Sequence, residues 1–213
     1  MPKLESFENY ALAYDQWFDS HKTEYELELK AIRLFLPENA KGVEIGAGTG
    51  RFSQPLGISL GVEPSKSMRD IAIRRGVNMV EGKAESLPIA NNAFDYVLFV
   101  TTDCFLESPV IAYKEARRIL NNGGFIIVAM IDRNSSLGRK YEQTKHESKF
   151  YKEATFHSVQ EVQADLETAG FKHFEYVQAI LPADSDENLK PGIMPGFGKG
   201  SFIVIRAQKD ATF

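Results

Sequence analysis

The sequence predicts an α/β fold with a mostly parallel, doubly wound sheet and helices on both of its faces. Short apolar runs alternate with amphipathic helical patterns from Gly42 to Ile131. Three glycines spaced two residues apart, Gly46, Gly48 and Gly50, directly follow the first apolar run. Ligands of such sheets bind beyond the carboxyl ends of the strands, so we expect a binding site at this glycine turn.

Length and charge limit the classes of function. The 213 residues are 43% hydrophobic and 25% charged, enough for one core, and we expect a single domain over 1–213. A net charge of −4 without a basic run disfavours nucleic acid, and no apolar stretch is long enough to span a bilayer. We therefore expect neither nucleic acid nor a membrane as partner. The single cysteine, Cys104, and the lack of a signal pattern predict a cytoplasmic protein.

Two helices are expected before the first strand. Aromatic residues recur at helical spacing and predict one aromatic face, at Phe7, Tyr10, Tyr14, Trp17 and Phe18. Core packing is the more common role of such a face. Thr23 and Glu26 predict a capping box for a second helix, which Pro37 ends.

The remaining elements follow in order. We expect strands at 42–45, 58–63, 78–81, 94–100, 125–131, 174–181 and 201–207. Helices are expected around Phe52, at 65–75, at 109–120 and from a Ser158/Glu161 capping box to Gly170. The stretches 132–149 and 181–200 lack a clear period, and we expect loops there.

The glycine turn suits a nucleotide or nucleoside cofactor, because unpaired amides at a helix start are accessible to a ligand where side chains are absent. Arg51 occupies the third glycine position of a dinucleotide fingerprint, and no Gly-Lys-Ser/Thr completes a P-loop. Glu44, inside the end of the strand, would repel a pyrophosphate but can accept hydrogen bonds from a cationic or hydroxyl-bearing ligand. The preferred ligand is therefore not polyanionic at this turn.

A second acid is predicted at the same edge. Glu63 ends the second strand before Pro64 and Ser65, where we expect an exposed carboxylate that can accept hydrogen bonds from both ribose hydroxyls. The alternative is an ordinary acid near a helix start. Its position one strand from the glycine turn favours the ribose role. The turn 82–88 follows the third strand at the same edge and is placed to contact adenine.

Four motifs occur in order between Val43 and Gly124. They are Glu44-x-Gly46-x-Gly48-x-Gly50, Val62-Glu63-Pro64-Ser65-x-x-Met68, Gly82-x-Ala84-Glu85-x-Leu87-Pro88, and Asn92-x-Phe94-Asp95 with Gly123-Gly124. Together they resemble class I S-adenosylmethionine-dependent methyltransferases, especially the small-molecule (type 11) group that includes ubiquinone and menaquinone biosynthesis enzymes. The resemblance implies a Rossmann-like, seven-stranded sheet with an antiparallel last strand. It also implies an amino-terminal helical lid (1–37), a cofactor-binding core (41–131) and a substrate-side segment with the last strands (132–213).

The resemblance assigns a role to each matching position. The Glu44 acid and the glycine backbone hold the methionine part, Glu63 the ribose, and Met68 packs on the adenine. Ala84 and Glu85 give backbone contacts to adenine, Val100 and Thr101 meet the methionyl amino group, and Tyr14 of the closing first helix reaches the carboxylate. The expected S-adenosylmethionine contacts, shared by the product S-adenosylhomocysteine, are Tyr14, Glu44, Gly46, Ala47, Gly48, Gly50, Glu63, Pro64, Met68, Lys83, Ala84, Glu85, Val100 and Thr101. Lys83 replaces a common aspartate, Pro55 shortens the helix after Gly50, and an aromatic packing helix explains Tyr14 equally well.

The methyl acceptor is expected to be a small molecule. In-line displacement needs aligned reactants and exclusion of water, and a base only for some acceptors. Trp17 and Asp103 are candidates for the acceptor pocket, with Asp103 as cation ligand or base; a surface acid near a helix is the more common case. Cys104 is expected to be buried and His146 solvated, and the histidines show no metal-ligand spacing.

Two other functions remain open. A noncatalytic module could bind the sulfonium compound or its demethylated product as a signal or structural ligand, since cofactor motifs alone do not require transfer. A nicotinamide dehydrogenase is opposed by Arg51 in the fingerprint.

Overall fold

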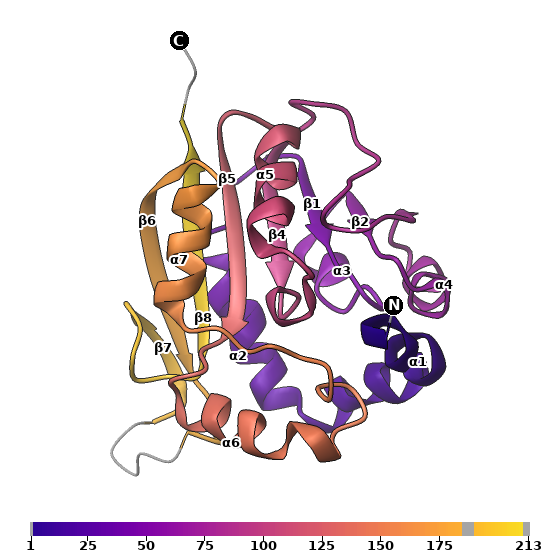
Figure 1. Cartoon of the computed structure of the whole chain (residues 1–213), viewed down its shortest axis with the longest axis vertical. Coiled ribbons are helices and arrows are strands. Elements are labelled where there is room, and N and C mark those ends of the chain that lie inside the picture. The colour runs from indigo at the N-terminus through magenta and orange to yellow at the C-terminus, as the bar shows by residue number, and fades with distance from the viewer. Residues whose placement is uncertain (1, 185–189, 211–213) are drawn as a thin grey trace.

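The fold is a mixed eight-stranded sheet with helices on both faces (Figure 1). The computed structural model describes residues 2–184 and 190–210. The strand order is β3-β2-β1-β4-β5-β8-β6-β7. The strands are β1 (Gly42–Ile45), β2 (Leu60–Val62), β3 (Met79–Val80), β4 (Phe94–Val100), β5 (Leu120–Ile131), β6 (Phe171–Ile180), β7 (Gly192–Pro195) and β8 (Phe202–Lys209).

Helices connect the parallel strands and cover the sheet. They are α1 (Pro2–Ser20), α2 (Lys22–Arg33), α3 (Ser53–Leu56), α4 (Lys66–Arg74), α5 (Pro109–Ile119), α6 (Ser136–Thr144) and α7 (Val159–Thr168), with 3₁₀ turns η1 (Asp103–Phe105) and η2 (Lys145–Glu147). In Figure 1, α5 and α7 lie on the near face of the sheet, and α2 and α3 lie behind it. The predicted doubly wound α/β architecture is confirmed.

The predicted number of strands is wrong. Among the described residues the sheet has eight strands, because β7 pairs with β6 inside the stretch 181–200 that was expected to be a loop. Glycine and proline surround this four-residue strand and hide its pattern. The last strand is antiparallel to β5, as expected, and β7 is antiparallel to β6. Part of the expected loop, 185–189, lies outside the described residues.

Local capping explains where several helices begin. The capping box of Ser158 and Glu161 is present at the start of α7. The predicted box of Thr23 and Glu26 is wrong, since α2 begins one residue after His21, which makes no side-chain cap. The expected loop 132–149 contains α6, whose first turn is capped by the Ser135 hydroxyl.

The core has one layer on each face of the sheet. Strand β4 and the second half of β5, residues 126–131, are buried almost throughout, as their continuous apolar runs predict. One layer contains residues of α5 and α7, and the other contains residues of α2. The predicted aromatic face of α1 is only partly inward: Tyr10 is 44% exposed and Trp17 36%.

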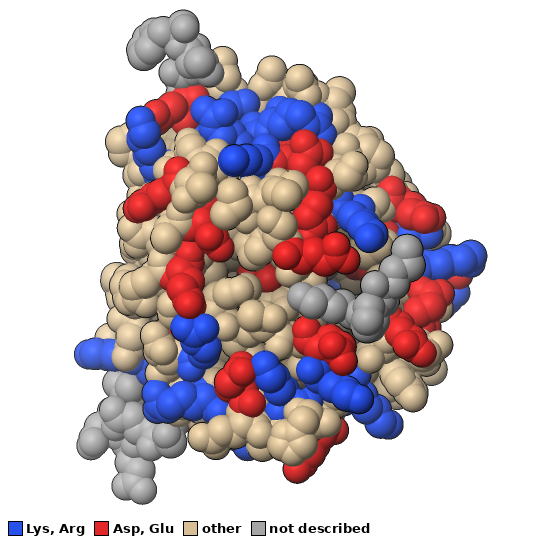
Figure 2. Space-filling view, in the orientation of Figure 1, with Lys and Arg blue, Asp and Glu red and all other residues tan. Residues whose placement is uncertain are grey.

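Charges of both signs are interspersed over the face shown in Figure 2. No described helix combines the length and the apolar character needed to span a membrane.

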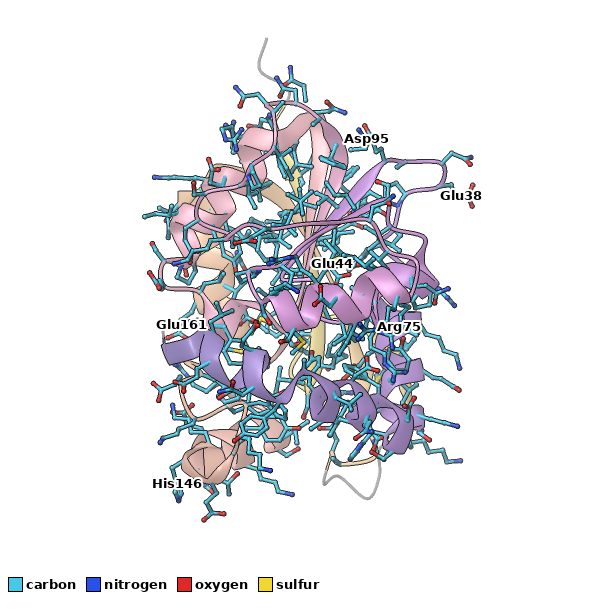
Figure 3. All side chains as sticks on the ribbon, turned by 90° about the vertical axis from the view of Figure 1, so that its right-hand side faces the viewer. Glu38, Glu44, Arg75, Asp95, His146 and Glu161 are labelled. Atoms are coloured by element: carbon cyan, nitrogen blue, oxygen red, sulfur yellow. The ribbon has the colours of Figure 1, made fainter. Side chains whose placement is uncertain are left out.

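Helix α1 lies beside α4 at one end of the sheet (Figures 1 and 3). The buried Asp15 carboxylate accepts hydrogen bonds from Arg51 and Arg75, at 2.9 Å to each guanidinium. Glu8 accepts hydrogen bonds from the hydroxyls of Ser65 (2.6 Å) and Ser67 (3.0 Å) at the start of α4. Charge-assisted hydrogen bonds therefore hold α1 on the site end of the sheet.

We expect Asp15→Asn to loosen α1, because Arg51 and Arg75 would lose their shared anion. Urea unfolding should show a loss of about 2 kcal/mol, and α1 amides should exchange hydrogen faster. Asp19→Asn is the matched control: its side chain is 62% exposed in its pair with Arg51, so we expect a much smaller loss than for Asp15→Asn. Equal losses in the two variants would contradict the proposed anchoring.

Candidate functional site

A pocket lies at the carboxyl ends of β1, β2, β3 and β4, with α1 as one wall. Its cavity volume is about 170 Å³. The lining residues are Leu4, Phe7, Tyr14, Gly46, Gly48, Glu63, Pro64, Met68, Gly82, Lys83, Ala84, Glu85, Val100, Thr101, Thr102, Phe105, Leu106 and Glu107. The pocket is therefore formed by the three turns that the sequence predicts to meet at this edge.

The glycine turn has backbone conformations that favour glycine. Gly46, Gly48 and Gly50 have φ values of 72°, 52° and 76°. A Cβ on Gly46 would lie 2.5 Å from the Thr102 side chain, and one on Gly50 would lie 2.9 Å from Val77. A Cβ on Gly48 would meet only Tyr14, at 3.8 Å. Gly46 and Gly50 thus permit close packing, whereas Gly48 faces the pocket beside α1.

Glu63 joins two of the turns. One carboxylate oxygen accepts the Gly48 amide at 3.0 Å, and the other accepts the Ser65 amide at 2.9 Å. The expectation of an exposed strand-end acid is wrong, because Glu63 is only 7% exposed under α1 and the glycine turn. Burial raises the pKa of Glu63, opposed by these two amides. Each oxygen keeps acceptor capacity toward the pocket.

Glu44 lies behind the pocket rather than in its wall. It is 1% exposed and accepts a hydrogen bond from the Ser53 hydroxyl at the start of α3. Figure 3 shows it in the interior of the molecule. Burial raises the pKa of Glu44 to about 8. Ala47 and Gly50, also predicted as cofactor contacts, do not line the pocket either.

The other predicted cofactor positions all line the pocket. These are Tyr14, Gly46, Gly48, Glu63, Pro64, Met68, Lys83, Ala84, Glu85, Val100 and Thr101. Sequence reasoning missed Leu4, Phe7, Gly82, Thr102, Phe105, Leu106 and Glu107. Thr102 and Phe105 directly follow predicted positions at the end of β4, so a longer segment there would have included them.

Neither predicted acceptor residue lines the pocket. Trp17 stacks on His21 with ring centroids 4.2 Å apart. Asp103 is 3% exposed, not a surface acid, because η1 turns it inward against His157, with 3.4 Å between Oδ2 and Nδ1. This carboxylate raises the pKa of His157. Cys104 is buried and His146 exposed, as expected.

Aromatic rings form the wall between α1 and the segment after α6. Phe7 contacts Phe105 at a centroid distance of 4.9 Å and Tyr14 at 5.8 Å. Phe105 stacks on Tyr151 at 6.0 Å, and Tyr151 on Tyr141 at 5.1 Å. Only the rings of α1 show a helical period in the sequence, because Phe105, Tyr141 and Tyr151 lie in segments where no such period is visible.

One buried carboxylate near this wall was also missed. Glu28 of α2 is only 6% exposed, on the same buried face as Leu29 and Ile32. Burial raises the pKa of Glu28 to about 8. No cluster of three or more metal-ligating side chains occurs in the described part of the chain.

Comparisons with known proteins agree on one family. A family model described as a methyltransferase domain matches residues 43–128. A crystal structure from Thermotoga maritima, described as a SAM-dependent methyltransferase and possible histamine N-methyltransferase, is 45% identical, with 98% of this chain and 100% of that chain covered and a TM-score of 0.92.

Two further proteins are similar to this chain over most of its length. An uncharacterized protein of Methanocaldococcus jannaschii is 42% identical over 97% of this chain and 100% of its own length. A demethylmenaquinone methyltransferase of Staphylococcus carnosus is 24% identical over 79% of this chain and 84% of its own length.

The raised pKa of Glu44 predicts that the unfolding free energy depends on pH. Because its pKa is about 8 in the folded chain and 4.5 is the ordinary value, its contribution to stability is complete below about pH 4.5 and is lost as the pH rises through 8. Each unit of pKa difference corresponds to about 1.4 kcal/mol. We expect Glu44→Gln to flatten the decrease in unfolding free energy between pH 5 and 8, measured with urea. The exposed Glu26→Gln is the control, and an unchanged slope in Glu44→Gln would contradict the burial effect.

Proposed function

Since the chain belongs to the S-adenosylmethionine-dependent methyltransferases, we propose that it transfers a methyl group to a small-molecule acceptor by in-line displacement. The main support is the pocket in which Glu63, the glycine turn and the turn 82–88 converge at the carboxyl edge of the sheet. Fold alone would not carry this conclusion, since one fold hosts many reactions.

The residues present fit an adenosine with a methionine tail. Glu63 has acceptor capacity for two ribose hydroxyls, and Met68 is an apolar wall for a base. The Ala84 and Glu85 turn offers backbone groups on the same side, and the Gly48 position leaves room beside Tyr14. We assign the methionine end to the side of Gly46 and Thr101, where β1 and β4 end. Glu44 would act there only through the position of the glycine turn, since its carboxyl group faces Ser53.

The bound sulfonium supplies an electrophilic methyl carbon. The chain positions the acceptor and excludes water with the apolar wall of Phe7, Tyr14 and Phe105. A bound sulfonium donor would give its methyl carbon to the acceptor's lone pair and would keep the electron pair of the carbon–sulfur bond. Any proton on the acceptor atom then goes to a nearby base or to water.

Two classes of acceptor are suggested by the similar proteins. The Thermotoga maritima protein is described as a possible N-methyltransferase of an amine, and the Staphylococcus carnosus protein methylates a quinone precursor by its name. The direct experiment is transfer of labelled methyl from S-adenosylmethionine to a panel of amines, thiols, phenols and quinol precursors. Binding of S-adenosylhomocysteine without transfer to any member would favour a noncatalytic binding module.

We expect Glu63→Gln to lower the affinity for S-adenosylhomocysteine at least tenfold, measured by calorimetry. The amide nitrogen of glutamine cannot accept a hydrogen bond, so a backbone amide or a ribose hydroxyl loses its partner. Glu81→Gln is the control, because its side chain is 75% exposed in the pair with Arg69. Wild-type affinity in Glu63→Gln would remove this carboxylate from the cofactor site.

Comparing Gly48→Ala with Gly57→Ala separates an effect on the shape of the pocket from an effect of backbone strain. Gly48 and Gly57 both have positive φ, 52° and 67°, and no atom lies within 4 Å of a Cβ on Gly57. Both alanine variants should lose roughly 1 kcal/mol of stability. Only Gly48→Ala should weaken S-adenosylhomocysteine binding in the same titration. Equal binding by the two variants would show that the turn at Gly48 is only a structural bend.

A further inference from the structure

The carboxylate of Glu28 has no partner within the part of the chain that the structure describes. It lies on the buried face of α2 with Leu29 and Ile32, and Glu28 is 6% exposed. No hydrogen bond or salt bridge from a described residue reaches it. A buried carboxylate normally has a hydrogen-bond donor or a cation, because its charge has lost water. Glu28 therefore needs an explanation beyond packing.

This carboxylate borders open space rather than a sealed interior. Among the described residues, three side-chain polar atoms are fully sealed from solvent and have no hydrogen-bond partner. They are Thr49 Oγ1, the Tyr113 hydroxyl and Arg206 Nε. The Glu28 oxygens are not among these atoms, so they border space that a water-sized group can enter. Within described residues, the hydroxyls of Tyr14, Tyr141 and Tyr151 have no hydrogen-bond partner and are not sealed either.

Glu28 lies on the face of α2 that packs near aromatic residues, since Tyr14 and Tyr141 pack against the apolar cluster that contains its helix neighbours Leu29 and Ile32. Its charge acts on Tyr14 of α1, on Tyr141 of α6 and on Tyr151 after η2, and it raises the pKa of each hydroxyl along with burial. Tyr14 lines the cofactor pocket, and Tyr151 stacks on Phe105 of the same pocket. Figure 1 shows α1, α2 and α6 around one end of the sheet. Tyr14 thus connects the surroundings of Glu28 with the pocket, whose lining does not include Glu28 itself.

The electrostatic environment here is negative. The charges that act on the Tyr14 hydroxyl include Glu44, Glu28 and Glu63, and those on Tyr25 add the cations Arg51 and Arg75. Both guanidiniums are already paired with Asp15. Glu24, on the same helix, is a further acid that acts on Glu28. Such a site favours a cation, and ring faces add cation–π attraction of about 0.5 to 2 kcal/mol.

We propose that Glu28 binds the positively charged nitrogen of a basic organic amine, which is the methyl acceptor, while Tyr14, Tyr141 and Tyr151 surround its apolar part. The proposal rests on the proposed methyl transfer. A neutral quinol would give the Glu28 carboxyl no cation to stabilise its charged form, and an anionic acceptor would oppose that form. Basic amines are mostly protonated at neutral pH, and the nitrogen must lose a proton before its lone pair can attack. A carboxylate can accept that proton, which balances the step.

The test measures amine binding to the complex with S-adenosylhomocysteine. The probes are benzylamine and 2-phenylethylamine, each paired with the neutral alcohol of the same skeleton, titrated by calorimetry at pH 7.5. We expect at least one amine to bind tenfold or more tightly than its alcohol. Glu28→Gln should remove this preference and retain S-adenosylhomocysteine affinity. Glu26→Gln, exposed on the same helix, should retain both.

Two results would overturn the proposal: no amine binds better than its alcohol, or Glu28→Gln keeps the preference. Loss of S-adenosylhomocysteine binding by the wild type would instead refute the proposed function. If Glu28→Gln fails to fold, carbon-13 NMR of the wild type decides. A bound amine should lower the pKa of the Glu28 carboxyl by a unit or more, and an unchanged pKa would contradict the assignment.

Discussion

The carboxylate of Glu63 connects the parts of the pocket. It accepts the backbone amides of Gly48 and Ser65, which belong to turns after different strands. Burial removes water from this carboxylate, so the two amides have to replace it. Val62 adds to this connection, because its carbonyl accepts the amides of Gly46 and Ala47. The glycine turn and the start of α4 are thereby held in one relative position, and the pocket between them has a fixed floor.

The same turn also holds the helix that closes the pocket. The Ser65 hydroxyl accepts the Met68 amide as a helix cap and donates to Glu8 of α1. Helix α1 in turn contributes Phe7 and Tyr14 to the pocket wall. A displacement of α1 therefore changes the wall and breaks its hydrogen bonds at the start of α4 together. Because so much of the wall belongs to α1, access of a ligand to the inner site is coupled to the position of this one helix.

The sequence predicted the elements whose period is set by burial on the sheet, and most of the residues that line the pocket. It predicted β4, β5 and α7 well because continuous apolar runs and a capping box are local signals. It failed where tertiary contacts decide. Strand β7 forms only because β6 offers an edge, and Asp103 and Glu28 are buried by segments distant in the chain. Solvent exposure of an acid cannot be deduced from its neighbours in sequence, which is why Glu63 was also expected to be exposed.

Glu44 and Glu28 show how the same residue type serves different purposes under similar burial. Both have a pKa raised to about 8 by burial, but Glu44 accepts a hydrogen bond from Ser53 and thereby links β1 to α3. Glu28 has no hydrogen bond or ion pair among the described residues, so no interaction offsets the cost of burying its carboxyl group. Apolar side chains at similar depth, such as Leu29, would fill the same helix face at no such cost. A carboxylate that destabilises the free protein has a physical reason to be there if it binds a ligand, and this is the argument behind the proposed amine site at Glu28.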